Sequence, residues 1–137
     1  MSNIILPARI EYLHSFIEFV ADRAEKEGFG EKKIKEIELA MEEALVNIFS
    51  YAYPEKAGDV ELICSMNNDN GFIIEILDDG IPFNILSLPD PDLNASISDR
   101  RIGGLGVYII RNIVDDLRYR RDGGKNILTF IIHKKKI

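Results

Sequence analysis

The stretch EKKIKEIELAMEEALVNIFSYAYPEKAGDVELICSM, residues 31–66, decides the fold because the spacing of its apolar residues changes partway along it. Before Pro54 they recur every three to four positions, which predicts a helix from about Glu31 to Tyr51. Over residues 58–67 they alternate with mostly polar residues, which predicts a strand. The buried stripe predicted for the helix is Ile34, Ile37, Met41, Ala44, Leu45 and Ile48. The alternating apolar residues of the strand are Val60, Leu62, Cys64 and Met66.

The flanking sequence predicts two more helices and four more strands. Helical spacing indicates a first helix from about Arg9 to Glu27, ended by Gly28, and a later one over Leu105–Leu117. Between them, the turn-rich segment 67–71 joins two strands as a hairpin. The buried stripe predicted for the first helix is Ile10, Leu13, Ile17, Val20 and Ala24. The expected strands lie at 3–8, 58–67, 72–77, 118–122 and 126–133.

The resulting element order is β-α-α-β-β-loop-α-β-β. It predicts an α+β fold, a two-layer α/β sandwich whose mixed, mostly antiparallel sheet is covered on one face by about three helices. Strands and helices do not alternate as parallel βαβ units, which excludes a Rossmann pattern. The length of 137 residues fits a single domain, 1–137.

Composition narrows the class of protein. The formal net charge of −6 disfavours direct nucleic-acid binding, because an acidic surface repels phosphates. Cys64 is the single cysteine, so no internal disulfide forms, and its strand position predicts a buried, inert thiol. No apolar run reaches the ~20 residues of a membrane helix, and the N-terminus has no signal-peptide pattern. We therefore expect a cytoplasmic protein without a membrane partner.

Glu43 and Asn47 stand four residues apart on the second helix, so their side chains are neighbours. A carboxylate and a carboxamide there offer a general base and an oxygen ligand for a hard cation such as Mg²⁺. A solvated acidic face is the alternative. Against it, Leu39, Val46 and Phe49 make the helix apolar on a second side, which predicts cover on more than one face and a cleft beside Glu43.

Two further segments have the residue types of a nucleotide site. Asp78-Asp79-Gly80-Ile81-Pro82-Phe83 follows a strand, and is either a plain turn or an edge where a carboxylate reads a base amine. Gly103-Gly104-Leu105-Gly106 opens a helix, and is either a flexible hinge or a set of free N–H groups facing an anion. Arg100 and Arg101 precede it and can add positive charge for a terminal phosphate.

Taken in order, these three segments resemble the GHKL ATP-binding superfamily, and within it the anti-sigma-factor serine kinases of bacterial partner-switching systems. The resemblance covers roughly residues 9–133. Glu42-Glu43-Ala44-Leu45-Val46-Asn47 is similar to that family's N-box, and Asp78-x-Gly80-x-Pro82-Phe83 to its adenine box. Gly103–Ile110 resembles the family's glycine box, and Gly124–Thr129 resembles its final strand. One departure is Tyr51, where the family often has a histidine.

The resemblance implies the Bergerat ATP-binding fold, with ATP and Mg²⁺ as cofactors and an ATP lid at about 84–103. Under it, Glu43 is the general base, Asn47 the Mg²⁺ ligand and Asp78 the partner of the adenine amine. The other residues implied to bind the nucleotide are Gly80, Pro82, Arg101, Gly103, Gly104, Leu105, Gly106 and Thr129.

The implied function is a serine/threonine protein kinase that acts as an anti-sigma-type regulator. It phosphorylates an anti-anti-sigma (STAS-like) protein, binds a sigma factor or similar regulator, and forms a homodimer. A second hypothesis is a module that holds ATP or ADP and sequesters a partner without kinase activity. A third is the detached catalytic domain of a histidine kinase. It is disfavoured because His14 faces polar residues on the first helix with no dimerisation hairpin ahead of it, and so is not expected to be a phosphoacceptor.

Overall fold

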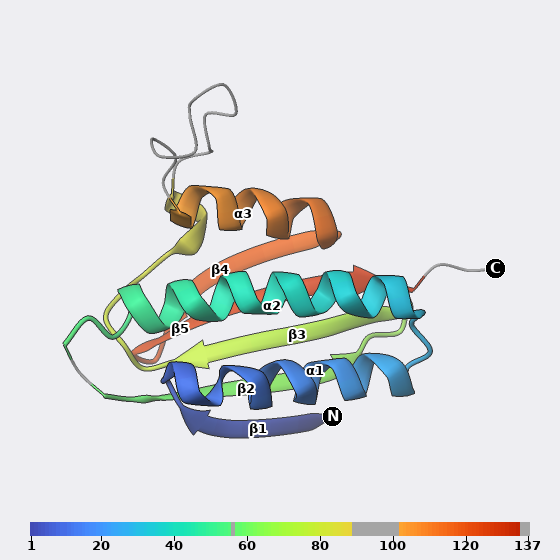
Figure 1. The fold of residues 1–137 in the computed structure, drawn as a ribbon, viewed down its shortest axis with the longest axis horizontal. Coiled ribbons are helices and arrows are strands. Elements are labelled where there is room, and N and C mark those ends of the chain that lie inside the picture. The colour runs from blue at the N-terminus through green and yellow to red at the C-terminus, as the bar shows by residue number, and fades with distance from the viewer. Residues whose placement is uncertain (56, 89–101, 135–137) are drawn as a thin grey trace.

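The computed structural model describes residues 1–55, 57–88 and 102–134 (Figure 1). The order of its elements matches the predicted order, with two short 3₁₀ turns in addition. The helices are η1 (Ile10–Tyr12), α1 (Leu13–Lys26), α2 (Glu31–Tyr51), η2 (Ile85–Ser87) and α3 (Ile102–Ile113). The strands are β1 (Ser2–Pro7), β2 (Asp59–Met66), β3 (Gly71–Asp78), β4 (Asp116–Asp122) and β5 (Lys125–His133).

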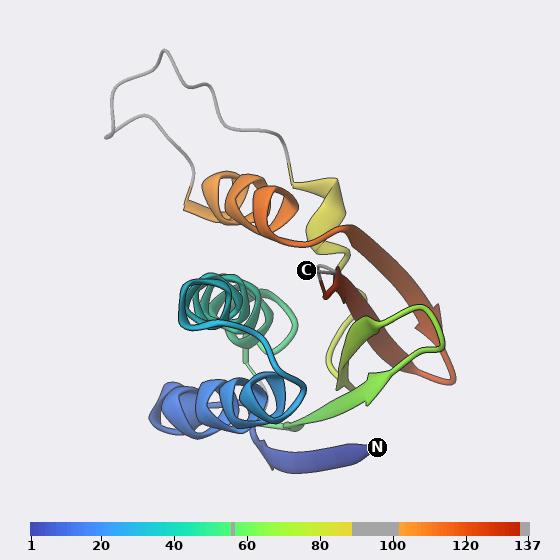
Figure 2. The ribbon, with the colours of Figure 1, turned by 90° about the vertical axis from the view of Figure 1, so that its right-hand side faces the viewer.

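The strands form one sheet in the order β1-β2-β3-β5-β4, with α1, α2 and α3 on the same face (Figure 2). This confirms the predicted two-layer α+β sandwich. A mixed sheet was expected, but each of the four strand pairings among the described residues is antiparallel. The chain avoids parallel pairing because β2–β3 and β4–β5 are hairpins, and β3 pairs with β5 only after the chain has crossed back through α3.

The central helix α2 lies between α1 and α3 over the middle of the sheet (Figure 1). It begins and ends at the predicted residues, Glu31 and Tyr51, and its predicted stripe is buried except for the half-buried Ile34. On its second apolar side Phe49 packs against Phe16 of α1, with ring centroids 6.1 Å apart. Leu39 remains 41% exposed, so the expected cover of that side extends along only part of the helix.

Two helices differ from the prediction in where they begin or end. The first α-helix begins at Leu13 rather than near Arg9, and Ile10, expected in the core, is 60% exposed in the 3₁₀ turn. The third helix begins at Ile102 and ends at Ile113, whereas Leu105 and Leu117 were expected, so Gly103–Gly106 lie in its first turns. Spacing of apolar residues could not reveal this start, because glycines have no side chain to show the period.

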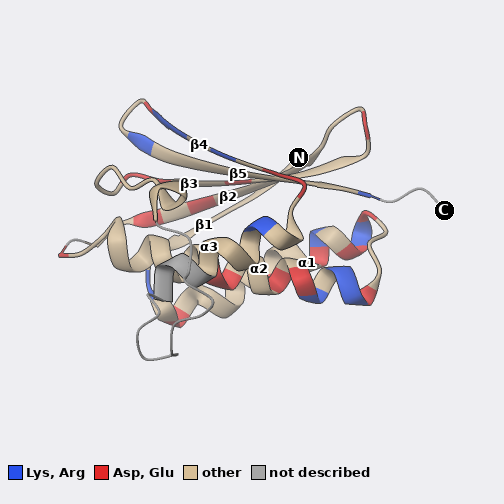
Figure 3. Cartoon of the chain, turned by 90° about the horizontal axis from the view of Figure 1, so that it is seen from above, with Lys and Arg blue, Asp and Glu red and all other residues tan. Residues whose placement is uncertain are grey.

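The two faces of the sheet are chemically different. Alternate residues of β3 and β5 face the helices and form the core, which also buries Cys64 as predicted. The other face has no helix over it in the described part of the chain, and a row of arginines on β4 lies at its edge (Figure 3). In none of the described helices is there a stretch long and apolar enough to cross a membrane.

Candidate functional site

Asp78 ends β3 directly opposite Asn126 of β5, on the face of the sheet that the helices cover. Both side chains are 3% exposed. Asn126 Nδ2 donates to Asp78 Oδ1 at 2.8 Å, and the Gly80 N–H donates to the same oxygen at 3.0 Å. Among the described residues both bonds to this carboxylate end on Oδ1. Its Oδ2 therefore keeps its capacity to accept a hydrogen bond from a ligand.

Asn126 makes the full set of hydrogen bonds that its amide allows. Besides its bond to Asp78, Nδ2 donates to the Ile81 carbonyl at 2.8 Å. Its Oδ1 accepts from the Phe83 N–H at 3.1 Å and from the Tyr119 hydroxyl at 2.6 Å. The prediction missed this residue. The available signal was a polar side chain at an inward-facing position of the last strand, where the neighbouring inward residues are apolar.

The environment of Asp78 makes its charge costly. Burial raises the pKa of its carboxyl, and the hydrogen bonds from Asn126 and Gly80, together with the nearby charge of Arg121, only partly offset this. A buried carboxylate kept against such a cost, at the end of a strand, is typical of a binding site.

On α2, Glu43 and Asn47 form the predicted neighbouring pair. Asn47 is 4% exposed, and its Nδ2 donates to the Glu43 backbone carbonyl at 2.7 Å, which leaves its Oδ1 to face a ligand. Glu43 is half-buried. Burial, and next the negative charge of Glu42, raise the pKa of its carboxyl. A carboxylate with a raised pKa is the more effective proton acceptor.

Gly106 of α3 brings the glycine segment against this pair. A Cβ on Gly106 would lie 2.8 Å from Glu43 Oε2 and 3.2 Å from Asn47 Nδ2. The structure thus places the third predicted segment beside the first, and glycine leaves a space there that any other residue would fill. Gly103, Gly104 and Leu105 lie in the turn of α3 just before it. Arg101 and residues 89–101 of the expected lid lie outside the described residues.

The donor set beside Gly106 fits a divalent cation bound together with a nucleotide. In the parts of the chain that the structure describes, no group of three or more His, Cys, Asp or Glu side chains is arranged to hold a metal ion. Mg²⁺ ordinarily takes one or two protein oxygens and completes its shell with water and substrate phosphates. Asn47 Oδ1 supplies one such oxygen, beside the Glu43 carboxylate.

The turn after Asp78 is fixed to the end of α2. The Ile81 N–H donates to the Ala52 carbonyl at 2.9 Å, and a Cβ on Gly80 would collide with that same carbonyl oxygen. Glycine at position 80 is therefore required for this close approach. Arg121 of β4 donates to the Gly80 carbonyl at 2.9 Å from the other side. This clamping places the turn beside Tyr51, although neither motif predicts the contact by itself.

An aromatic pair lies at this junction. Tyr51, at the end of α2, stacks on Phe83 with ring centroids 5.1 Å apart and planes 26° apart. Tyr51 is partly exposed, so its ring offers an apolar surface beside the turn. This is the position where the family often has a histidine.

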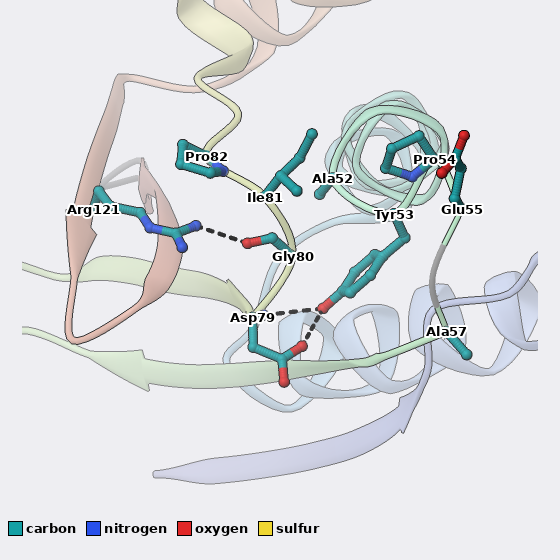
Figure 4. A pocket seen from close by; sticks show the side chains of 10 residues that line it. All are labelled: Ala52, Tyr53, Pro54, Glu55, Ala57, Asp79, Gly80, Ile81, Pro82 and Arg121. Carbon is teal, nitrogen blue, oxygen red and sulfur yellow. Dashed lines mark hydrogen bonds between the residues drawn. The ribbon is translucent and has the colours of Figure 1, made fainter.

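A cavity of about 480 Å³ opens on the outer side of the same turn (Figure 4). Gly80 and Pro82 of the predicted site line it, but Glu43, Asn47 and Asp78 do not. Tyr53 lies at its floor, donating to Asp79 Oδ1 at 2.7 Å and accepting from the Asp79 N–H at 2.9 Å. The cavity therefore does not include the predicted catalytic pair.

Thr129 is not brought to the site. It is paired with Glu75 of β3 and Arg118 of β4. Because strand residues alternate between faces, and Asn126 and Leu128 face the helices, Thr129 points to the open face of the sheet. The expectation that Thr129 supports the nucleotide is therefore wrong. Asn126, three residues earlier, is the residue of this strand that contacts Asp78.

Comparison with protein families matches residues 6–132 to the histidine kinase-like ATPase domain. Among curated proteins, the chain is similar to the serine-protein kinase RsbW of Bacillus cereus (strain G9842), with 30% identity over 129 residues. It is similar to the protein of the same name from Bacillus mycoides (strain KBAB4), with 28% identity over 127 residues. Each alignment covers 90% of this chain and 79% of the relative.

Two solved structures share the fold. One comprises the RsbU and RsbW domains of Rv1364c from Mycobacterium tuberculosis, with a TM-score of 0.63 and 14% identity. The match covers 97% of this chain and 32% of that one. The other is the histidine kinase domain of the blue-light-activated histidine kinase EL346 from Erythrobacter litoralis, with a TM-score of 0.55 and 21% identity. That match covers 88% of this chain and 60% of the other.

Proposed function

Because the chain belongs to the histidine kinase-like ATPase domain family, we propose that it binds Mg·ATP and transfers the γ-phosphoryl group to a serine or threonine of a partner protein. The observation that carries the proposal is the contact of Gly106 with Glu43 and Asn47, which joins the glycine segment to a base and a cation ligand. The curated relatives are named as serine-protein kinases, which supports the same reaction here.

Asp78 is the residue proposed to select the base. Its free Oδ2 accepts a hydrogen bond from an exocyclic amine such as that of adenine, while Oδ1 stays bonded to Asn126 and Gly80. The Gly80 backbone is proposed to line the base, Pro82 and the stacked Tyr51 ring to flank it, and the N–H groups of α3's first turn to face the phosphates. In this proposal Gly103, Gly104, Leu105 and Gly106 supply those groups.

Glu43 is proposed as the general base. Its carboxylate accepts the proton of the serine hydroxyl as that oxygen forms a bond to the γ-phosphorus. The bond from the γ-phosphorus to the bridging oxygen breaks, and ADP leaves. Burial supports this role, because it raises the pKa of Glu43. Asn47 Oδ1 would hold Mg²⁺, and the cation would supply positive charge to neutralise the phosphates.

The proposed substrate is a small anti-anti-sigma (STAS-like) protein, and the proposed regulatory target is a sigma factor or similar regulator. The curated relatives named RsbW support a kinase of this type. We place this activity in the cytoplasm, where ATP and such regulators meet. The 84–103 segment is proposed as the lid over the nucleotide in a single domain.

Self-association is a separate part of the proposal. The open face of the sheet carries the half-buried Ile63, Ile73 and Ile131, an acidic side that includes Glu75 on β3, and a basic side that includes Arg118 on β4. A second copy related by a two-fold axis brings acidic and basic sides together. Sedimentation of wild type and Ile73→Lys tests this. We expect wild type to be a dimer and Ile73→Lys to be a monomer, and a monomeric wild type rules the dimer out.

The function is tested by capturing partners from the source cell on the immobilised chain, once with Mg·ATP and once with Mg·ADP. Each captured protein is then incubated with γ-labelled ATP and either wild type or Glu43→Gln. We expect label on a serine or threonine with wild type and none with Glu43→Gln, although both bind ATP. If wild type binds ATP but transfers no phosphate to any captured partner, the kinase proposal fails and the chain is a nucleotide-dependent binding module.

A further inference from the structure

We propose that Asn126, held by Tyr119, is a positioning residue that fixes the Asp78 carboxylate and thereby sets the preference for a base with an exocyclic amine. This inference rests on the proposed nucleotide site and adds its specificity. It is carried by four hydrogen bonds at one buried amide, which join three separate segments of the chain.

The orientation of the Asn126 amide is fixed by its backbone partners. The Phe83 N–H can only donate and the Ile81 carbonyl can only accept. Asn126 Oδ1 must therefore face Phe83 and its Nδ2 must face Ile81, as the distances of 3.1 and 2.8 Å require. The second hydrogen of Nδ2 is then directed at Asp78 Oδ1. A flipped amide would set Nδ2 against the Phe83 N–H, and Oδ1 against the Ile81 carbonyl and the Asp78 carboxylate.

Tyr119 completes the set from the adjacent strand. Its hydroxyl lies 2.6 Å from Asn126 Oδ1, and that oxygen has no hydrogen, so Tyr119 is the donor. Tyr119 is half-buried and its ring packs against the core. Removing the hydroxyl alone therefore loosens Asn126 while leaving the packing in place.

The fixed amide determines what Asp78 can recognise. With Oδ1 occupied by Asn126 and Gly80, the carboxylate cannot rotate without breaking two bonds. Its Oδ2 then meets the ligand as an acceptor. An exocyclic amine satisfies that oxygen, whereas a base without the amine leaves a buried charged acceptor unpaired, which is costly. Loss of the Asn126 donor frees the carboxylate to turn and to take up a proton, and so reduces the discrimination.

A small cavity borders the pair. Asp78, Asn126 and Tyr119 line it with four apolar side chains, and its volume is about 10 Å³. This is room for a single water molecule at most. Asn126 holds Oδ1 of the carboxylate, whereas the base is proposed to meet Oδ2.

The test measures base preference, which a purely stabilising network would not change. Affinities of the full chain for Mg·ATP and for the Mg²⁺ complex of purine riboside triphosphate, which lacks the exocyclic amine, are determined by calorimetry. The variants are Tyr119→Phe and Asn126→Asp. Glu75→Gln, on the open face of β3, is the matched control.

For wild type and the control we expect ATP to be preferred on the order of 10- to 100-fold, the value of a hydrogen bond to a charged group. The preference should fall a few-fold in Tyr119→Phe and nearly vanish in Asn126→Asp, which replaces the donor with an acceptor. An unchanged preference in folded Tyr119→Phe overturns the inference alone, even where Asn126→Asp fails to fold. If wild type binds neither nucleotide, the proposed function fails as well.

Discussion

Gly106 of α3 packs directly against Glu43 of α2, so that a Cβ at position 106 would lie 2.8 Å from Glu43 Oε2. The two residues are more than sixty positions apart in the chain. A glycine is therefore needed at position 106 so that the proposed catalytic carboxylate can keep its place, and not in order to bend the helix. The contact connects the position of the third helix to the chemistry on the second.

Gly106→Ala should lower the rate of phosphoryl transfer without lowering the stability of the fold. Alanine favours a helix over glycine by about 1 kcal/mol, so the melting temperature should hold or rise. The added methyl displaces the Glu43 carboxylate, which sits at the end of a flexible side chain, and phosphoryl transfer should fall at least tenfold. Gly30→Ala adds a methyl group in open space at the N-cap of α2 and should leave transfer unchanged. Equal activity of the two variants contradicts the assigned role.

Asp78→Asn should weaken ATP binding and yet stabilise the fold. The folded-state pKa of Asp78 is raised by burial, so its contribution to stability is present below the ordinary carboxyl pKa and lost as pH rises through the folded value. At neutral pH the ionised side chain is therefore a cost that asparagine removes. Thermal unfolding of the variant at pH 7 should show an equal or higher melting temperature than wild type.

The same variant should bind ATP on the order of 10- to 100-fold more weakly, because its amide N–H₂ meets the base amine donor to donor. Asp79→Asn, one residue later, carries the same charge change on an exposed side chain and serves as the control. A loss of stability in Asp78→Asn without a loss of affinity would show that the carboxylate is structural.

The rate of phosphoryl transfer should fall on the acid side with the titration of Glu43. The base works only when ionised, and burial raises its pKa, so the fall should begin at a higher pH than an exposed glutamate would give. Single-turnover rates at saturating ATP across pH 5–8 measure this. Glu42→Gln removes the neighbouring negative charge and should move the profile toward lower pH, since that charge also raises the pKa. If the pH profile of Glu42→Gln is the same as that of wild type, Glu43 is not the general base.

Cys64 should be unreactive in the folded protein. Burial raises the pKa of its thiol to about 12, so almost no thiolate exists at neutral pH. A thiol reagent at pH 7.5 should label it only after denaturant is added, and should then label one site per chain. Rapid labelling without denaturant would mean that β2 opens readily.

How much of the molecule could be read from the sequence depends on side-chain periodicity. The α2 helix was predicted to the residue because its apolar stripe is continuous and Pro54 follows it. The start of α3 was missed because Gly103, Gly104 and Gly106 carry no side chain to show helical spacing. The missing side chains also allow the close contact of Gly106 with Glu43. The glycines therefore both obscure the start of the helix in the sequence and make room for the site.

A contact within the site could be predicted only where its two residues are close together in the sequence. Glu43 and Asn47 are local neighbours on a helix, so their proximity follows from spacing alone. The bond from Asn126 to Asp78 depends on the pairing of β3 with β5, forty-eight residues apart, and no local pattern sets that register. Thr129 was misassigned for this reason: a three-residue shift along a strand changes both the depth and the face.

The location of the nucleotide is tested most directly by amide chemical shifts of the ¹⁵N-labelled chain during titration with Mg·ATP. We expect saturable shifts centred on Asn47, Asp78 and Gly106, with the side-chain amide of Asn126 among them and α1 unaffected. The proposed nucleotide site is contradicted if ATP causes no saturable shift, or if the largest shifts fall on α1 or around Tyr53 in the outer cavity.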